Sequence, residues 1–304
     1  LKRSVGLVFL FLHGSVYSFD HNQNVPIQGT GYTITLLPET QPSTGPVNLT
    51  EVVQYHEEPV AEGTLDQAAQ DHEEENVPAL DLLLSAVEKG DLERVKALVN
   101  ALEIDVNQPN SYGYTALHLA AIGGHEAVVR LLVGELNVDI NQSTSQGHTA
   151  LHFAAGEGHE GLVRVLVHEL KVDVNQSSPQ GNTALHWAAR AGHEGVVRLL
   201  VGELKVDVNQ TNSHGETALH WAARAGQEGV LRLLVCEFKV DVNQTDSKGR
   251  TALHLAAEKG YEEVVRLLVQ EFKADVNQRD KWGQTALHWA AVKGHEGVVR
   301  VRGN

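Results

Sequence analysis

The stretch Gly181-Asn182-Thr183-Ala184-Leu185-His186-Trp187-Ala188-Ala189 decides the fold, because its Thr-Ala-Leu-His core recurs along the chain. The recurring threonines lie 34 residues apart, at Thr115, Thr149, Thr183, Thr217, Thr251 and Thr285. A fixed period of this length is typical of stacked supersecondary units that pack on their neighbours. The chain is therefore expected to be a repeat array and not a set of independent globular domains.

Each unit predicts two helices and a loop. In the unit that begins at Gly181, Thr183 is expected to cap a first helix and Gly192 to end it. An apolar stripe at helical spacing predicts a second helix around residues 196–201, and an extended loop follows at residues 205–210. One helix pair is too small to bury both apolar stripes, so neighbouring units must cover them.

These residues resemble the ankyrin repeat, whose Thr-x-Leu-His-x-Ala-Ala, Gly-His and Asp-Val-Asn landmarks occur here in the family's order over roughly residues 78–304. The resemblance implies an all-α solenoid of stacked helix pairs joined by extended hairpin loops. We expect an atypical capping repeat at 78–110, five full repeats at 111–280 and a truncated repeat at 281–304. In the capping repeat, Asp81 stands where the later units have Thr, and it can cap a helix in the same way.

The units depart from the family pattern in two ways. Ala follows the Thr where the family usually has Pro, and each unit is one residue longer than the common 33. The extra residue lies where the family usually has a helix-ending Gly, and a large apolar residue stands there instead: Leu136, Leu170, Leu204, Phe238 and Phe272. The second helix is expected to run on by about half a turn and to bury this side chain, without a left-handed helix end.

The segment before the repeats has a different composition. Residues 1–24 include an apolar run that fits either a strand left from an upstream domain, Gly6 to Leu12, or a secretory signal. Residues 25–77 form an acidic linker rich in Pro, Gly and Thr, which is expected to be mostly disordered. The chain begins at Leu1, contains no Met and stops inside a repeat, so we expect a fragment of a longer protein.

Charge and cysteine usage bear on the partners and the compartment. The net charge is −15, which argues against nucleic acid and anionic membranes as partners. No apolar run is long enough for a transmembrane helix. The single Cys236 has no partner for an internal disulfide, and Asn-x-Ser/Thr acceptor patterns fall on structural asparagines of the repeat such as Asn175 and Asn209. A cytoplasmic or nuclear chain is expected.

Histidine is a common catalytic and metal-binding residue, but the spacing of the histidines in this sequence does not favour such a site. His118, His152, His186, His220, His254 and His288 recur once per unit, so they stack along the array and do not converge. The resemblance implies that each ring bonds the backbone of the neighbouring hairpin. The His-Glu pairs such as His193-Glu194 lack the second His that a zinc protease needs, since the fifth position is Val197. We expect no catalysis, cofactor or metal site.

Variable positions in each unit predict the functional surface. In the ankyrin family the hairpin tips and the exposed side of the first helices bind protein partners. The candidate partner-binding residues are Tyr112, Tyr114, His148, Asn182, Arg190, His214, Glu216, Arg224, Lys248, Arg250 and Trp282. Trp282 and the arginines, Arg250 among them, are expected to contribute to binding but not to stability, whereas Trp187, Trp221 and Trp289 are expected to pack inside the array.

The sequence thus favours a monomeric protein-interaction module that binds a protein partner. Two alternatives stay open. The repeats are the regulatory or targeting arm of an enzyme or signalling protein whose catalytic domain precedes residue 1, or the chain is a secreted binding protein, if residues 1–18 are a signal.

Overall fold

The computed structural model describes residues 79–102 and 104–301 and four short strands nearer the N-terminus. Strand β1 (Val8–Leu12) pairs with β2 (Ser15–Phe19), and β3 (Val25–Pro26) pairs with β4 (Thr33–Ile34), both antiparallel. These strands lie in a unit of their own, Leu1–Gln70. Strand β1 falls inside the apolar run, where the choice between strand remnant and signal stays a prediction. Apart from β3 and β4, the predicted linker lies outside the described residues.

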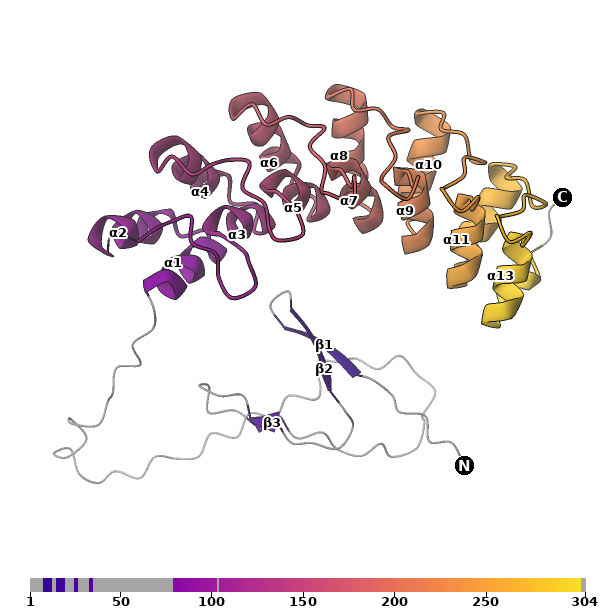
Figure 1. The fold of residues 1–304 in the computed structure, drawn as a ribbon, viewed down its shortest axis with the longest axis horizontal. Coiled ribbons are helices and arrows are strands. Elements are labelled where there is room, and N and C mark those ends of the chain that lie inside the picture. Colours follow the sequence, from indigo (N-terminus) through magenta and orange to yellow (C-terminus); the bar gives the residue numbers. More distant parts are fainter. Residues whose placement is uncertain are drawn as a thin grey trace. The chain divides into compact units, whose positions relative to one another are not determined.

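From Ala79 onward the described chain is a series of seven helix pairs, so the prediction of an all-α solenoid is confirmed. The odd-numbered helices lie along the hollow side of an arc and the even-numbered helices along its outside (Figure 1). The first pair is α1 (Ala79–Glu88) and α2 (Leu92–Leu102). The later first helices are α3 (Ala116–Ile122), α5 (Ala150–Gly156), α7 (Ala184–Ala191), α9 (Ala218–Ala225), α11 (Ala252–Lys259) and α13 (Ala286–Lys293).

The second helices are short, and all but the first and last continue as a π-helical segment. They are α4 (Glu126–Arg130) with η2 (Leu131–Glu135), α6 (Glu160–Arg164) with η3 (Val165–Glu169), α8 (Glu194–Val197) with η4 (Arg198–Glu203), α10 (Glu228–Arg232) with η5 (Leu233–Glu237), α12 (Glu262–Arg266) with η6 (Leu267–Glu271), and α14 (Glu296–Val299).

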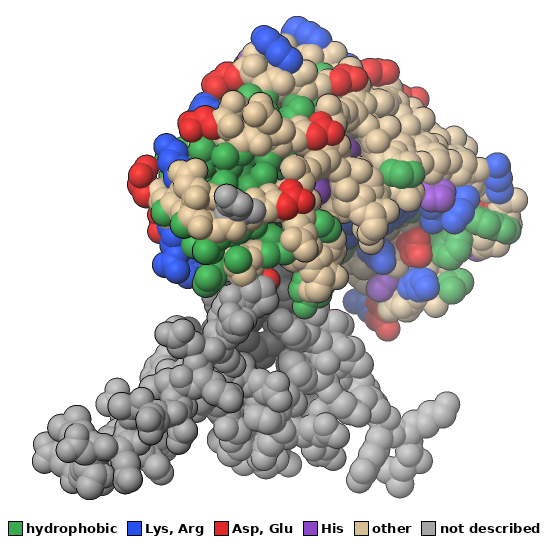
Figure 2. Space-filling view, turned by 60° about the vertical axis from the view of Figure 1, so that its left-hand side comes forward, with side chains coloured by type: hydrophobic (Ala, Val, Ile, Leu, Met, Phe, Trp, Pro, Cys, Tyr) green, Lys and Arg blue, Asp and Glu red, His purple; other side chains and the backbone are tan. Residues whose placement is uncertain are grey.

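The core runs the whole length of the array and is built from Leu, Val and Ala. In the central unit, Leu185 and Ala188 on α7 and Leu199 and Leu200 on η4 are at most 1% exposed. Small residues on the first helices let neighbouring helices approach closely, and larger ones on the second helices fill the space between units. Hydrophobic side chains also gather at the start of the array, which faces forward in Figure 2.

A histidine hydrogen bond joins each unit to the next one. We call His118, His152, His186, His220 and His254 the forward histidines. Each is less than 3% exposed. Nε2 of the last four lies 2.9 to 3.2 Å from the carbonyl oxygen of the residue 30 positions later, in the following hairpin. Nε2 of His118 lies 3.1 Å from the Gln142 carbonyl oxygen, in the loop that leads into that hairpin. The Nδ1 atom accepts from the backbone N–H of the Thr three residues earlier, so Nε2 carries the proton and donates. The structural role implied for these histidines is confirmed.

The same type of Thr-His pair starts each first helix from α3 to α13. The Thr183 Oγ1 accepts from the His186 backbone N–H while the His186 ring accepts from the Thr183 N–H, which is a capping box with His in place of Glu. The predicted cap at Thr183 and the predicted helix end at Gly192 are both present, and Gly192 adopts a φ of 89°. One imidazole therefore fixes a helix start and a contact between units.

A second set of histidines bonds in the opposite direction. We call His125, His159, His193 and His295 the backward histidines, since Nε2 of each bonds a carbonyl of the preceding unit at 2.7 to 3.0 Å. These rings pack on glycines with positive φ. A Cβ built on Gly158, whose φ is +82°, would lie 2.6 Å from Nδ1 of His193. Glycine is needed there both for its conformation and for the space it leaves.

The end of the second helix differs from the sequence expectation. The extra residue of each unit is absorbed as a π turn, in which the Leu136 N–H bonds the Leu131 carbonyl and the Val138 N–H bonds the Leu132 carbonyl. The chain then does adopt a left-handed conformation, at Asn137, Lys171, Lys205, Lys239 and Lys273. The expectation that this conformation is avoided is therefore wrong.

The lysines offset part of this conformational cost. Lys171 Nζ and Lys239 Nζ each donate at 2.6 Å to a carbonyl at the end of their own helix, on His168 and Cys236. The preceding apolar residues, Leu170 and Phe238 among them, are half-buried against the core and are not fully enclosed as expected.

We expect the array to lose stability as the pH falls from about 6.5 towards 4. Burial lowers the pKa of all five forward histidines, and that of His152 to about 4. Above pH 6.5 these rings are neutral in both the folded and the unfolded protein, so their protonation does not reduce the free energy of unfolding. Below pH 6.5 the histidines of the unfolded chain become protonated while those of the folded chain stay neutral. The free energy of unfolding therefore falls by up to about 1.4 kcal/mol per ring and pH unit. Urea unfolding at pH 7.5 and 5 measures this.

His186→Gln and His288→Gln are a matched pair of variants for that experiment. His186→Gln removes one buried titrating ring, so the gap between the two urea midpoints should narrow. His288→Gln should leave the gap unchanged, because His288 is exposed and no later hairpin carbonyl exists among residues 79–301 for its Nε2. An unfolding midpoint equal at both pH values in the unaltered protein would contradict the prediction.

Candidate functional site

The hairpin tips are held by polar side chains that bond their own loop. Asp246 Oδ1 accepts from the backbone N–H groups of Lys248 and Arg250, both at 2.8 Å. Asn212 and Asp280 do the same in the neighbouring units. Backbone bonds then join successive tips: Ser213 N–H to the Gln180 carbonyl, Ser247 to His214 and Lys281 to Lys248, at 2.8 to 3.0 Å. The tips of the last four units thus form one continuous edge.

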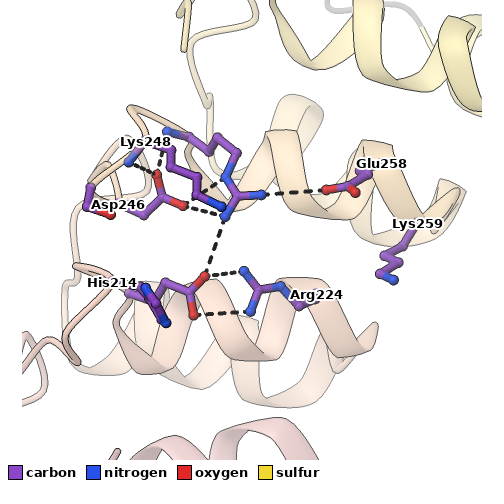
Figure 3. Close-up of a pocket in the computed structure, with 9 residues that line it drawn as sticks. His214, Arg224, Asp246, Lys248, Glu258 and Lys259 are labelled. Carbon is purple, nitrogen blue, oxygen red and sulfur yellow. Dashed lines mark hydrogen bonds and ion pairs between the residues drawn. The ribbon is translucent and has the colours of Figure 1, made fainter. Parts of the chain in front are cut away.

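A network of charges lies beneath this edge, on the hollow side. Glu216 is only 4% exposed, and its carboxylate accepts from Arg224 and, at 3.0 Å, from the Trp221 Nε1. Arg250 reaches it from the next unit at 3.5 Å and pairs more closely with Asp246, at 2.8 Å (Figure 3). Burial acts to raise the pKa of Glu216, but the bonds from Arg224, Asn212 and Trp221 outweigh it and lower the pKa to about 2. The carboxylate stays charged throughout the neutral range.

The network surrounds a hollow of roughly 320 Å³ that opens to solvent. Glu216, Asp246 and Arg250 form its paired interior, and His214, Lys248 and Lys259 are exposed around it (Figure 3). Asp246 and Lys259 were not among the residues expected from the sequence. Asp246 could have been predicted from the sequence, because the same position of every full unit holds a residue whose side chain accepts hydrogen bonds from its own turn. No regularity of the repeat predicts Lys259.

The earlier units carry aromatic rings in place of charges. Tyr114 packs against Phe153 with ring centroids 5.5 Å apart, and His148 lies edge-on to Trp187 at 4.7 Å. Burial lowers the pKa of His148. Trp187 lies 6.2 Å from Trp221, so the aromatic run continues from unit to unit along the hollow side.

The candidate residues fall into two groups of different exposure. Tyr112 is 79% and Trp282 58% exposed, and Arg190, His214 and Lys248 are also exposed. The others are partly or fully buried: Tyr114, His148, Asn182, Glu216, Arg224 and Arg250. Asn182 Oδ1 accepts from Asn212 Nδ2 at 2.9 Å, so it too serves the contact between units.

The three tryptophans assigned to packing are half-buried, and two of them also donate hydrogen bonds. Trp221 donates to Glu216, and Trp289 Nε1 donates to Asp280 at 2.9 Å. Arg190 lies over both Trp187 and Trp221, with its guanidinium carbon 5.9 Å from each ring. These rings therefore form the floor of the hollow side as well as part of the packing between units.

The described residues hold neither a metal-ligand cluster nor a membrane-spanning helix. Among residues 79–102 and 104–301, no three His, Cys, Asp or Glu side chains are grouped to hold a metal ion. No helix within those limits has the length and apolarity needed to span a bilayer. Cys236 is a free, exposed thiol.

Arg250 must be reassigned from a surface anchor to a structural ion pair. Its side chain is 14% exposed and that of Asp246 only 1%, so Arg250→Ala would leave a buried carboxylate without its cation. We expect Arg250→Ala to lower the free energy of unfolding by about 2–4 kcal/mol. Thermal or urea unfolding measures the change.

Arg198→Ala is the matched control for Arg250→Ala. Arg198 pairs with Glu237 on the outside of the array, where the two side chains are 52% and 46% exposed. Its loss should cost less than about 1 kcal/mol. Equal effects of the two substitutions would show that the Arg250 network adds nothing to stability.

Comparison with known proteins agrees with this geometry. A family model described as "Ankyrin repeats (3 copies)" matches residues 82–178, 166–246 and 236–301. The human protein "Ankyrin repeat domain-containing protein 39" is 57% identical over 44 residues, which are 14% of this chain and 24% of that protein. The matched segment is thus about a quarter of the relative's length. Because the family model covers most of the chain, the protein belongs to the ankyrin-repeat family.

Proposed function

We propose that this chain is a non-catalytic module that binds a protein partner through the hairpin tips and the hollow side of its array. Ankyrin repeats are in general protein-interaction modules. The observation that supports a binding site here is that each unit contains two kinds of position: residues that join the units and recur, and exposed residues that vary. The residues that join units, such as His186 and Thr183, recur in every full unit, whereas the exposed tip position varies between units: Tyr112, Gln146, Gln180, His214, Lys248 and Trp282, with Gln in two of the six.

The exposed side chains at these positions suit a protein partner. Trp282 and Arg190 are of the types that dominate the energy of protein interfaces. Trp282 is edge-on to Trp289 at 6.4 Å, which holds its ring in place while more than half of its surface stays open to solvent. A rigid, exposed aromatic residue loses little entropy on binding. We propose a monomer as the active form, with neither nucleic acid nor a membrane as partner.

Trp282→Ala and Arg190→Ala should weaken partner capture while leaving the unfolding midpoint nearly unchanged. Wild type and variants would be used to capture proteins from a lysate of the source organism, and the captured proteins compared by quantitative mass spectrometry. Residues at the centre of an interface contribute about 2 kcal/mol or more each, so the yield of specific partners should fall at least tenfold.

Two further variants make that experiment decisive. Arg198→Ala, on the outside of the array, should capture the same proteins as wild type. Trp221→Ala should instead destabilise the array by about 3–5 kcal/mol, because it opens a cavity and removes one of the hydrogen-bond donors to Glu216. If Trp282→Ala and Arg190→Ala capture the same proteins in the same yield as Arg198→Ala, the hollow side is not the binding surface.

We also propose that the chain works in the cytoplasm or nucleus. The exposed free thiol of Cys236 suits a reducing compartment. Asn243 lies in a glycosylation acceptor pattern, yet its Oδ1 accepts from the Asp275 N–H of the next unit at 2.8 Å. A glycan on this side chain would crowd the contact between two units.

Mass spectrometry of the protein from its natural source should find no glycan on the acceptor asparagines of the array. Asn175, Asn209 and Asn243 are the informative sites, because all three lie in the loops between units. Glycosylation of any of them would contradict the proposed compartment and favour the secreted alternative.

A further inference from the structure

We propose that the hollow side of the last four units is a docking surface for an acidic, extended polypeptide segment of the partner. The proposal rests on the proposed function and names the chemistry of the partner that this surface selects. The proposal is based on a strip of exposed cationic side chains that form no ion pair with a carboxylate. We call Arg190, Lys248, Lys259, Lys281 and Lys293 the basic strip.

The basic strip differs from the arginines on the second helices of the full units. Arginines on the second helices are paired: Arg130, Arg164, Arg198 and Arg232 each bond the Glu 39 residues later, on the next unit. In contrast, no member of the basic strip forms an ion pair with any residue of the described array, although all five are exposed. Exposed lysines at the ends of the second helices, such as Lys171 and Lys239, also form no ion pair, but they bond carbonyl groups of their own helices. The members of the basic strip lie instead on the first helices and hairpin tips, which line the hollow side.

The strip is confined to the later units. The position of Arg190 holds Ile122 and Gly156 in the two preceding units, and the position of Lys248 holds Tyr112 and Gln146. Units before residue 181 therefore present aromatic side chains and, at the position of Lys259, the exposed carboxylate of Glu157, while the units after it present cations. A partner segment is expected to place its acidic part over the later units.

Local geometry favours carboxylates at this place. Three carboxylates line the hollow, on Glu216, Asp246 and Glu258. Arg224 and Arg250 pair with them, and Lys248 and Lys259 add two further cations, so four cations face three carboxylates and an excess of positive charge remains. The hollow of roughly 320 Å³ has room for an acidic side chain between those two lysines (Figure 3). Hydrogen bonds between successive tips hold the backbone of Lys248 and Lys281 together, at 3.0 Å, which prepares the strip for a ligand that runs along it.

A protein segment fits this strip better than a nucleic acid does. The whole chain carries a net charge of −15, which repels a polyphosphate at long range. The cations are also interspersed with Glu258 and Asp280 on the same side. Such mixed charge suits carboxylates spaced along a polypeptide and not a uniform line of phosphates.

The test is fluorescence anisotropy of the full chain with a labelled peptide of alternating Glu and Ser. About 12 residues suffice, because an extended chain of that length spans roughly 40 Å. At about 50 mM salt the Glu-Ser peptide should bind, and a Gln-Ser peptide of equal length should bind at least tenfold more weakly, since exposed charge attraction is strongest at low salt.

Lys248→Gln combined with Lys259→Gln should weaken binding of the Glu-Ser peptide by roughly five- to twentyfold. Lys89→Gln combined with Lys96→Gln is the matched control. It makes the same change in net charge on the first helix pair, and it should bind as wild type does. Because all four side chains lie at or near the surface, both double variants should keep the unfolding midpoint of the wild type.

Three results would overturn the proposal: equal binding of the Gln-Ser peptide, wild-type affinity in the Lys248 and Lys259 double variant, or tighter binding of a single-stranded DNA of similar length. These outcomes are separate from a failure of the proposed function. If the Glu-Ser peptide does not bind but Trp282→Ala and Arg190→Ala still lose their captured partners, the hollow side is the binding surface and only the acidic class of partner is wrong.

Discussion

The hydrogen bond from each forward histidine to the next hairpin is the constraint on which the array depends. Its Nε2–H donates to a carbonyl of the following unit only while Nδ1 accepts from the Thr N–H of its own unit, as His186 does between Thr183 and Glu216. A neutral ring in one tautomer meets both demands, and a protonated ring meets only one. Helix start, hairpin position and stacking of units are therefore fixed by one side chain in one protonation state.

This arrangement explains why the tips are free to differ. The groups that join units are buried, and their partners are mostly backbone atoms such as the Glu216 and Arg250 carbonyls, so they do not depend on which side chain stands at a tip. Tip residues face solvent and add little to stability unless they take part in a network across units. Arg250 shows the exception, since its guanidinium joins Asp246 of its own unit to Glu216 of the preceding one.

The period of 34 residues and the local helix signals were enough to predict the array, the Thr183 cap and the role of His186. Two features could not be predicted in this way. The π turn at Leu136 depends on how the extra residue fits against the next unit, and helical periodicity carries no signal for it. The burial of Arg250 depends on its distance from Glu216, 34 residues away in the sequence, which local patterns do not contain. Exposed positions such as Trp282 were easier to predict from the sequence, because residues that vary between otherwise similar units tend to lie on the surface.

The distribution of charge connects stacking with binding. Each outer pair, such as Arg164 with Glu203, contributes little because both partners stand in water, yet together these pairs place carboxylates and guanidinium groups in register on the outside. Lysines such as Lys248 and Lys259 on the hollow side have no such counterpart within the described array. A chain with an excess of acidic residues thus carries exposed cations without ion pairs on the side where its units vary. Under the proposed function, the fixed scaffold would hold these cations in place and their charge would select an acidic partner segment.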